Sequence, residues 1–162
     1  MFRKVNHVHF VGIGGIGMSG IAELLLNLGF KVSGSDLHES SIIMSLMNKG
    51  AKVHFGHERD NVTNSDVLVY SSAVHDDNPE ILAAQEIGIP VIKRAEMLGE
   101  LIAVKPTSIA IGGTHGKTST TSIIGSVLTE AKMEPTLVVG GHVKNIESGS
   151  MLGRGEIIVV EA

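Results

Sequence analysis

A glycine-rich stretch with an embedded lysine is the part of this sequence best suited to chemistry on phosphate. Residues 112–119 read Gly-Gly-Thr-His-Gly-Lys-Thr-Ser. Main-chain N–H groups of such a loop can surround a polyphosphate, a lysine ammonium can lie against its β- and γ-phosphates, and a threonine hydroxyl can bind Mg²⁺. The spacing is shorter than in the common phosphate-binding loop, because only three residues separate Gly112 from Gly116. The stretch predicts an ATP site in which Lys117 and Thr118 are the reactive groups.

A second glycine-rich loop, Gly12–Gly17, occurs near the start of the sequence. Glycines at such positions allow a tight turn and a close approach of the backbone to a diphosphate. Asp36 follows Gly17 by nineteen residues, where a carboxylate can accept hydrogen bonds from ribose hydroxyls. NAD and UDP-sugars both carry a diphosphate and a ribose. This loop alone therefore leaves an NAD-dependent oxidoreductase and a UDP-sugar protein open.

The segments around the two loops follow one pattern, in which a helix ends at a glycine and an apolar strand begins. This occurs at Gly29, Gly50 and Gly88, since glycine accepts the left-handed backbone conformation that ends a helix. We expect strands at His7–Val11, Lys31–Ser35, Lys52–His54, Val67–Tyr70, Val91–Ile92, Ser108–Ile111, Thr136–Val139 and Ile157–Val160. We expect helices at Ile16–Leu28, Ser40–Lys49, Pro79–Glu86, Ala95–Ala103 and Lys117–Ala131, with Met44 and Met47 filling core space.

Alternation of helices and strands predicts an α/β fold with a mostly parallel sheet. The segment Lys105-Pro106-Thr107 follows a helix and precedes a new strand with its own glycine loop. We therefore expect a Rossmann-like domain over residues 1–105, followed by the start of a P-loop ATPase domain over residues 106–162.

Composition excludes several classes of function. The 162 residues carry a formal net charge of −4 and no basic run, which argues against a nucleic-acid surface. The sequence has no cysteine, so thiolate chemistry, disulfides and cysteine-ligated zinc are excluded. The apolar stretch Val8–Ala22 is too short and glycine-rich for a membrane span. We expect a cytoplasmic protein with no membrane or nucleic-acid partner.

Several motifs in order resemble the Mur ligase family, in the form of its alanine-adding member. They are residues 11–20 (Val-Gly-Ile-Gly-Gly-Ile-Gly-Met-Ser-Gly), Ser35-Asp36, Ser71-Ser72-Ala73-Val74, Asn78-Pro79-Glu80, Arg94-Ala95-Glu96-Met97-Leu98, Gly113-Thr114-His115-Gly116-Lys117-Thr118 and Val160-Glu161-Ala162. The resemblance covers essentially the whole chain.

The resemblance implies a site residue by residue. A UDP-sugar would contact Gly15, Ile16, Gly17, Met18, Ser19, Asp36, Ser71 and Ser72. ATP would contact Gly113, Thr114, His115, Gly116, Lys117, Thr118 and Ser119. Lys117 and His115 would be the catalytic side chains, while Thr118 and Glu161 would bind Mg²⁺. For the two serines, a plain turn role is an equal alternative.

The resemblance also implies an activity. Family members are ATP-dependent amino-acid ligases of peptidoglycan synthesis, and this form would join L-alanine to UDP-N-acetylmuramate through an acyl phosphate. The 162 residues would be the N-terminal part of such an enzyme, so we expect the chain alone to be inactive. We also expect its second half to be poorly covered and open to self-association through the apolar strand Ile157–Val160.

Alternatives remain at this point. Another ligase of the same superfamily, including folylpolyglutamate synthase, would share the ATP loop, and a non-catalytic nucleotide-binding protein would share both loops. His54 and His57 have loose spacing and no third ligand nearby, which favours a solvated or core-edge pair over a metal site. His7 and His9 alternate along an expected strand, which is typical of sheet patterning.

Overall fold

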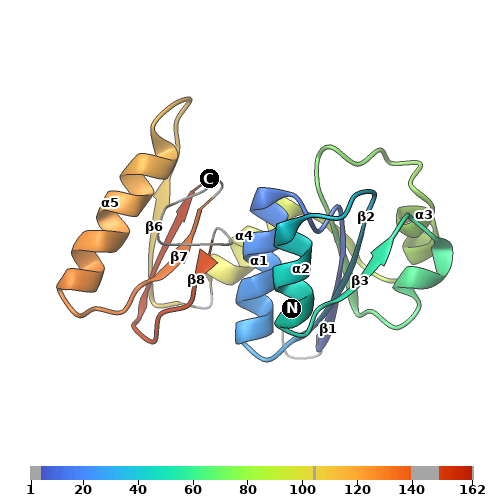
Figure 1. Cartoon of the computed structure of the whole chain (residues 1–162), viewed down its shortest axis with the longest axis horizontal. Helices are drawn as coiled ribbons and strands as arrows, with labels where there is room; N and C mark the ends of the chain where they lie inside the picture. The colour runs from blue at the N-terminus through green and yellow to red at the C-terminus, as the bar shows by residue number, and fades with distance from the viewer. Residues whose placement is uncertain (1–4, 104, 140–149, 162) are drawn as a thin grey trace.

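The computed structural model describes residues 5–103, 105–139 and 150–161, which form two sheets with helices packed around them (Figure 1). The first sheet has five parallel strands in the order β3-β2-β1-β4-β5. Its strands are β1 (His7–Val11), β2 (Lys31–Asp36), β3 (Lys52–Phe55), β4 (Val67–Tyr70) and β5 (Val91–Lys93).

The second sheet has four strands in the order β6-β9-β7-β8. Its strands are β6 (Thr107–Ile111), β7 (Thr136–Val138), β8 (Ser150–Met151) and β9 (Ile157–Glu161). Strand β9 pairs in parallel with β6 and β7, while β8 runs antiparallel to β7. Together the two sheets confirm an α/β fold with mostly parallel strands.

Five α-helices connect these strands, and their ends follow from local chemistry. They are α1 (Ile16–Asn27), α2 (Ser41–Asn48), α3 (Pro79–Glu86), α4 (Arg94–Ile102) and α5 (Lys117–Glu130), with a short 3₁₀ helix, η1 (Arg59–Val62). The side chain of Asn78 accepts a hydrogen bond from the N–H of Glu80 and so caps α3. Gly29, Gly50 and Gly88 have φ values of +88°, +104° and +78°, as the helix-ending pattern predicted.

Helix α1 lies between the two sheets, and the main hydrophobic core runs through it (Figure 1). That core combines side chains of α1 and the first sheet with Val138, Ile158 and Val160 of the second sheet. On the other face of the second sheet, Ile124 and Leu128 of α5 pack against a separate cluster around Val159. The helix that follows the first glycine loop is therefore also the helix on which the second half packs.

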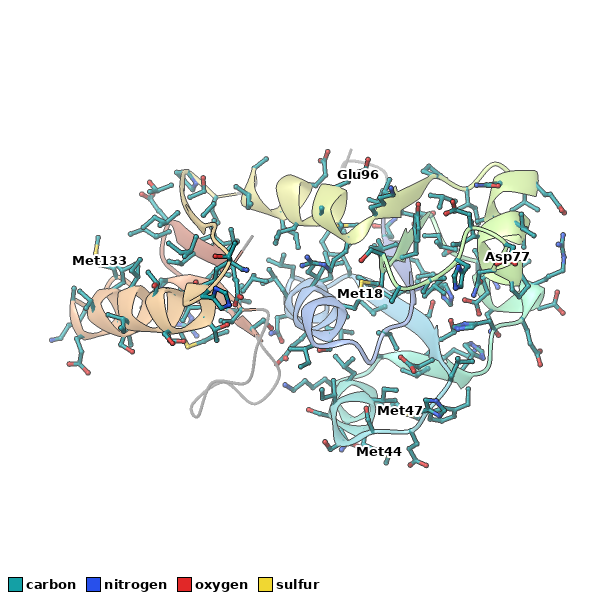
Figure 2. All side chains as sticks on the ribbon, turned by 90° about the horizontal axis from the view of Figure 1, so that it is seen from above. Met18, Met44, Met47, Asp77, Glu96 and Met133 are labelled. Carbon is teal, nitrogen blue, oxygen red and sulfur yellow. The ribbon has the colours of Figure 1, made fainter. Side chains whose placement is uncertain are left out.

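Two expectations differ from the structure. Met44 and Met47 on α2 are 44% and 39% exposed rather than core residues, whereas Met18 of α1 is buried (Figure 2). Residues 158–160 of β9, expected to be uncovered, are buried and paired on both edges. Among the described strands, the outer ones of this sheet are β6 and β8, and β6 is largely exposed. Self-association through such an outer strand stays a prediction. None of the described helices is long and apolar enough to cross a membrane.

Candidate functional site

The first glycine loop is anchored to the end of β2. The N–H groups of Gly12 and Ile13 both donate to the carbonyl of Ser35, at 2.9 and 3.1 Å. The N–H of Gly14 donates to Asp36 Oδ2 at 2.8 Å. A β-carbon on Gly14 would lie 2.8 Å from that oxygen and 2.9 Å from Ile43 Cδ1. Glycine is required here because Asp36 and the loop fit together without space for a methyl group.

Helix α1 begins directly after this loop. Its N-cap, Gly15, supplies no side-chain hydrogen bond, so main-chain N–H groups of the first turn are available to an anion. Ser19 is fully buried and its hydroxyl donates to the carbonyl of Ile16 at 2.9 Å. The first turn of α1 can therefore contact an anion through its backbone N–H groups. The Ser19 side chain is not free for such a contact, because it hydrogen-bonds within the helix.

The second glycine loop joins β6 to α5. Gly113 and Gly116 have φ values of +151° and +77°, in the region that favours glycine. Lys117 Nζ donates to the carbonyl of Gly113 at 2.7 Å, which folds the lysine back over its own loop. Thr114 and His115, at the tip of the loop, are exposed. The two glycines allow a tight turn, and the lysine of the loop is held against the loop's own backbone.

Thr118 and Glu161 meet beside this loop. Strand β9 pairs with β6 so that Glu161 lies opposite Ile111, the last residue before the loop. Thr118 Oγ1 lies 2.9 and 3.1 Å from the two carboxylate oxygens of Glu161. A hydroxyl and a carboxylate are both ligands that suit Mg²⁺. The described residues contain no group of three or more His, Cys, Asp or Glu able to hold a metal.

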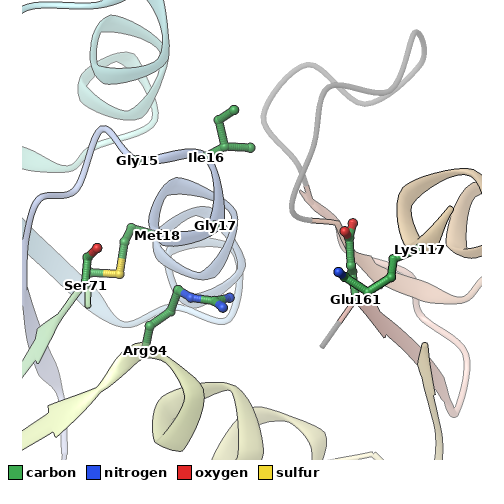
Figure 3. Close-up of a pocket in the computed structure, with 8 residues that line it drawn as sticks. All are labelled: Gly15, Ile16, Gly17, Met18, Ser71, Arg94, Lys117 and Glu161. Atoms are coloured by element: carbon green, nitrogen blue, oxygen red, sulfur yellow. The ribbon is translucent and has the colours of Figure 1, made fainter. Parts of the chain in front are cut away.

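The two loops face one cavity of about 400 Å³ (Figure 3). Its lining comes from both halves of the chain: Gly15, Ile16, Gly17, Met18, Ser71, Arg94, Lys117 and Glu161. Six of these residues belong to the expected UDP-sugar and ATP sets, and Glu161 belongs to the expected metal ligands. The fold thus brings together residues as far apart in the sequence as Gly15 and Glu161. Ser72 lies apart, in a smaller cavity with Tyr70 and Lys93.

Arg94 is a cavity residue that sequence reasoning did not assign a role. It begins α4, and its guanidinium points into the cavity from the first half (Figure 3). A β-carbon on Gly17 would lie 3.2 Å from one guanidinium nitrogen, so the side chain lies across the start of α1. The sequence signal was its place in the motif Arg94-Ala95-Glu96-Met97-Leu98, two residues after the expected strand Val91–Ile92.

A second cavity, of about 510 Å³, lies beyond Asp36 at the carboxyl ends of the first four strands. It is lined by Gly12, Asp36, Leu37, His38, His57, Ala73, Val74, His75, Asp77, Asn78 and Pro79. Gly12 of the first glycine loop and Asp36 both line it. The Asp36 carboxylate also accepts from the N–H of Leu37 at 2.8 Å, which fixes its orientation at the cavity edge.

Behind the second cavity lies a buried polar cluster around Glu80. Burial raises the pKa of Glu80, but hydrogen bonds from His9, Ser35 and Asn61 outweigh it, and the pKa lies below its ordinary value. His9 and Glu80 are completely buried, so the expected role of His9 in plain sheet patterning is incomplete. Burial, followed by the charge of Lys52, lowers the pKa of His54.

Comparison with known proteins adds a family context. Residues 7–106 match the Mur ligase family, catalytic domain. The chain is 56% identical over its whole length to UDP-N-acetylmuramate–L-alanine ligase from Geotalea uraniireducens and 57% identical to that from Nitrosospira multiformis. It covers 35% and 33% of those proteins, and so spans about a third of the length of the curated relatives it matches.

Solved structures agree with the sequence matches. The crystal structure of UDP-N-acetylmuramate–alanine ligase from Thermotoga maritima superposes with a TM-score of 0.88 at 33% identity, covering 96% of this chain and 37% of that one. A UDP-N-acetylmuramate:L-alanyl-γ-D-glutamyl-meso-diaminopimelate ligase from Neisseria meningitides gives the same TM-score at 28% identity, covering 98% of this chain and 52% of that one.

Proposed function

The chain belongs to the Mur ligase family, and from that premise we propose that it is the N-terminal part of a cytoplasmic, ATP-dependent ligase that joins L-alanine to UDP-N-acetylmuramate. The relatives at 56% and 57% identity carry that name. Because the chain spans about a third of their length, the activity belongs to the longer protein.

The observation that supports the proposal is a cavity lined both by the start of α1 and by Lys117 of the second glycine loop. Residues 15–18, at the end of the first glycine loop and the start of α1, would bind the diphosphate of the UDP-sugar. The second glycine loop, at Gly113–Ser119, would bind ATP. Asp36 would accept hydrogen bonds from the uridine ribose. An NAD-dependent oxidoreductase would need only the first glycine loop, so that function does not account for the second loop and its lysine.

The reaction needs two nucleotides in one cavity because a carboxylate is a poor electrophile. A lactyl carboxylate oxygen attacks the γ-phosphorus of ATP, and ADP leaves. The amine of L-alanine then attacks the acyl phosphate, loses a proton and expels inorganic phosphate, which leaves an amide. Such phosphoryl transfer depends on positioning and charge neutralisation rather than covalent participation of the protein.

The chain's own groups can meet those needs. Lys117 would leave the carbonyl of Gly113 and lie against the β- and γ-phosphates, where it stabilises charge in the transition state. Thr118 and Glu161 would bind Mg²⁺, which neutralises the same phosphates when it is bound. His115 would shape the tip of the loop, and Ser71 would contact the sugar substrate from the opposite wall.

Phosphate release by the longer protein tests the proposal. Release should require ATP, Mg²⁺, UDP-N-acetylmuramate and L-alanine together, because phosphate leaves only after amine attack. Phosphate release that continues at the same rate without the UDP-sugar would contradict it.

A further inference from the structure

A line of polar side chains runs from the start of β1 into the core of the first half. His7 Nε2 and His9 Nδ1, which alternate on β1, each lie 2.8 Å from the hydroxyl oxygen of Ser33 on β2. At one end, His7 Nδ1 lies 2.6 Å from the carbonyl oxygen of Asn64. At the other end, His9 Nε2 lies 3.4 Å from Glu80 Oε2. These groups form one chain with four hydrogen-bond links.

The number of protons in this chain follows from its two ends. The Asn64 carbonyl only accepts hydrogen bonds. The Glu80 carboxylate also only accepts, because its pKa lies below the ordinary value and it is ionised at neutral pH. The four links therefore need four protons. A neutral imidazole and a hydroxyl each carry one, so His7, Ser33 and His9 supply three. The complete chain needs one more proton, which makes one of its imidazoles an imidazolium.

Ser33 allows that proton to lie on either histidine. If Ser33 donates to His7, its oxygen accepts from His9, and His9 carries both N–H groups. If Ser33 donates to His9 instead, His7 carries both. His7 is half-buried, whereas His9 and Glu80 are completely buried. The proton can therefore enter from solvent at His7, and at His9 it faces a carboxylate with little screening by solvent.

A second branch from Glu80 has no such requirement. Ser35 Oγ donates to Glu80 Oε2 at 2.5 Å, and His57 Nδ1 lies 2.9 Å from Ser35 Oγ. His57 lines the second cavity with a side chain that is 17% exposed, so this branch ends at a ring in contact with solvent. One proton from Ser35 and one from a neutral His57 complete its two links.

Charged groups face the chain from both neighbouring strands. Asp66, directly before β4, accepts from the N–H of His7 at 2.9 Å. Backbone hydrogen bonds of this kind, joined by the charge of His7, hold the pKa of Asp66 below its usual value. On β3, burial lowers the pKa of His54, and the charges of Lys52 and His9 lower it further. A carboxylate thus lies at the solvent end of the chain, and the neighbouring His54 is kept neutral.

We propose that His7, Ser33, His9 and Glu80 form a proton-binding site that holds one proton beyond those of two neutral imidazoles and a carboxylate. Loss of this proton must break one of the four links, because three protons cannot fill four hydrogen bonds. The site is therefore a proton-dependent connection between β1, β2 and α3. The inference does not depend on the proposed function, since it concerns protons and no nucleotide.

Nitrogen NMR of the isotope-labelled 162-residue chain tests the proposal, because the shifts of the two ring nitrogens distinguish a neutral imidazole from an imidazolium. At about pH 7.5 an ordinary histidine is mostly neutral, yet the wild type should show one imidazolium shared between His7 and His9. Ser33→Ala removes both inner links, and two neutral rings then fill the two that remain. Both rings should therefore be neutral in that variant. His7→Ala, at the half-buried end, should leave His9 neutral as well if Ser33→Ala folds poorly.

Ser35→Ala is the matched control. Ser35 lies two positions after Ser33 on β2, is also buried, and likewise connects a histidine to its next partner. Its branch needs no additional proton, so the imidazolium should remain in Ser35→Ala even if the melting temperature falls. A merely structural role for the two serines would change the melting temperature of both variants and the charge of no ring.

The same proton should appear in the pH dependence of unfolding. A proton that the folded chain binds and the unfolded chain releases makes the folding equilibrium constant fall as pH rises, by up to about tenfold per pH unit. In urea titrations above about pH 7, the wild type and Ser35→Ala should show this fall more steeply than Ser33→Ala and His7→Ala. Two neutral rings in the folded wild type at about pH 7.5 would overturn the inference. An imidazolium that persists in both Ser33→Ala and His7→Ala would overturn it too.

Discussion

Replacing Gly14 with alanine should test the fit between the first loop and Asp36. The added β-carbon would lie 2.8 Å from Asp36 Oδ2 and 2.9 Å from Ile43 Cδ1. Ile43 is completely buried. If its side chain moves to make room for the added methyl group, the core becomes overpacked, which lowers the free energy of unfolding by about 1–3 kcal/mol. Relief by movement of Asp36 breaks the hydrogen bond from the N–H of Gly14, and a bond to a charged group contributes about 1.5–3 kcal/mol.

Either route predicts that the free energy of unfolding falls by about 2 kcal/mol. For a chain of this size, that loss lowers the melting temperature by about 4–8 °C. Thermal unfolding followed by circular dichroism measures it. UDP affinity should fall as well, because the added methyl group pushes the loop away from Asp36. Gly99→Ala is the control, since nothing lies within 4 Å of its added β-carbon. That change lies inside α4 and should leave the melting temperature equal or higher. A Gly14→Ala protein that melts with the wild type would refute the reasoning.

Three further predictions follow from the same structure. In the longer enzyme, Lys117→Ala should lower turnover by orders of magnitude, because the charge on the γ-phosphoryl group loses its counterion, while UDP-sugar binding survives; near-normal turnover would contradict the ATP-loop assignment. The pKa of Glu80 is lowered in the folded protein, so its contribution to stability is present above the unfolded-state pKa and is lost as pH falls through the folded-state pKa. In urea titrations, the free energy of unfolding of Glu80→Gln should therefore fall less steeply with decreasing pH than that of the wild type. Parallel pH curves for the two proteins would refute this. The 162-residue chain alone should release no phosphate from the full substrate set, since it spans 35% of its relatives; steady-state release above background would show otherwise.

The parts of the fold that could be predicted are those set by local backbone chemistry. Gly29, Gly50 and Gly88 each mark a helix end because a left-handed residue is needed there, whatever the rest of the chain does. The two glycine loops were found from the spacing of their glycines between an expected strand and an expected helix. The two-residue strand β8 and the short helix η1 were not predicted, since segments so short carry no periodic signal.

Contacts between distant residues could not be predicted from one sequence. His9 and Glu80 are 71 positions apart, and nothing in either local pattern indicates that both are buried together. Helix α1 reads as an ordinary apolar helix, and its second contact surface on Val138 and Ile158 becomes visible only in the fold. Arg94 likewise became visible as a cavity residue only when the fold brought it beside Gly17.

The most direct test of the account is the choice of ligand by the first loop. Calorimetry on this chain with UDP-N-acetylmuramate, UDP and NAD compares the candidates that share a diphosphate and a ribose. We predict that the UDP-sugar binds most tightly and that UDP retains measurable affinity, because the loop and Asp36 contact the nucleotide. Tighter binding of NAD than of UDP-N-acetylmuramate would contradict the account.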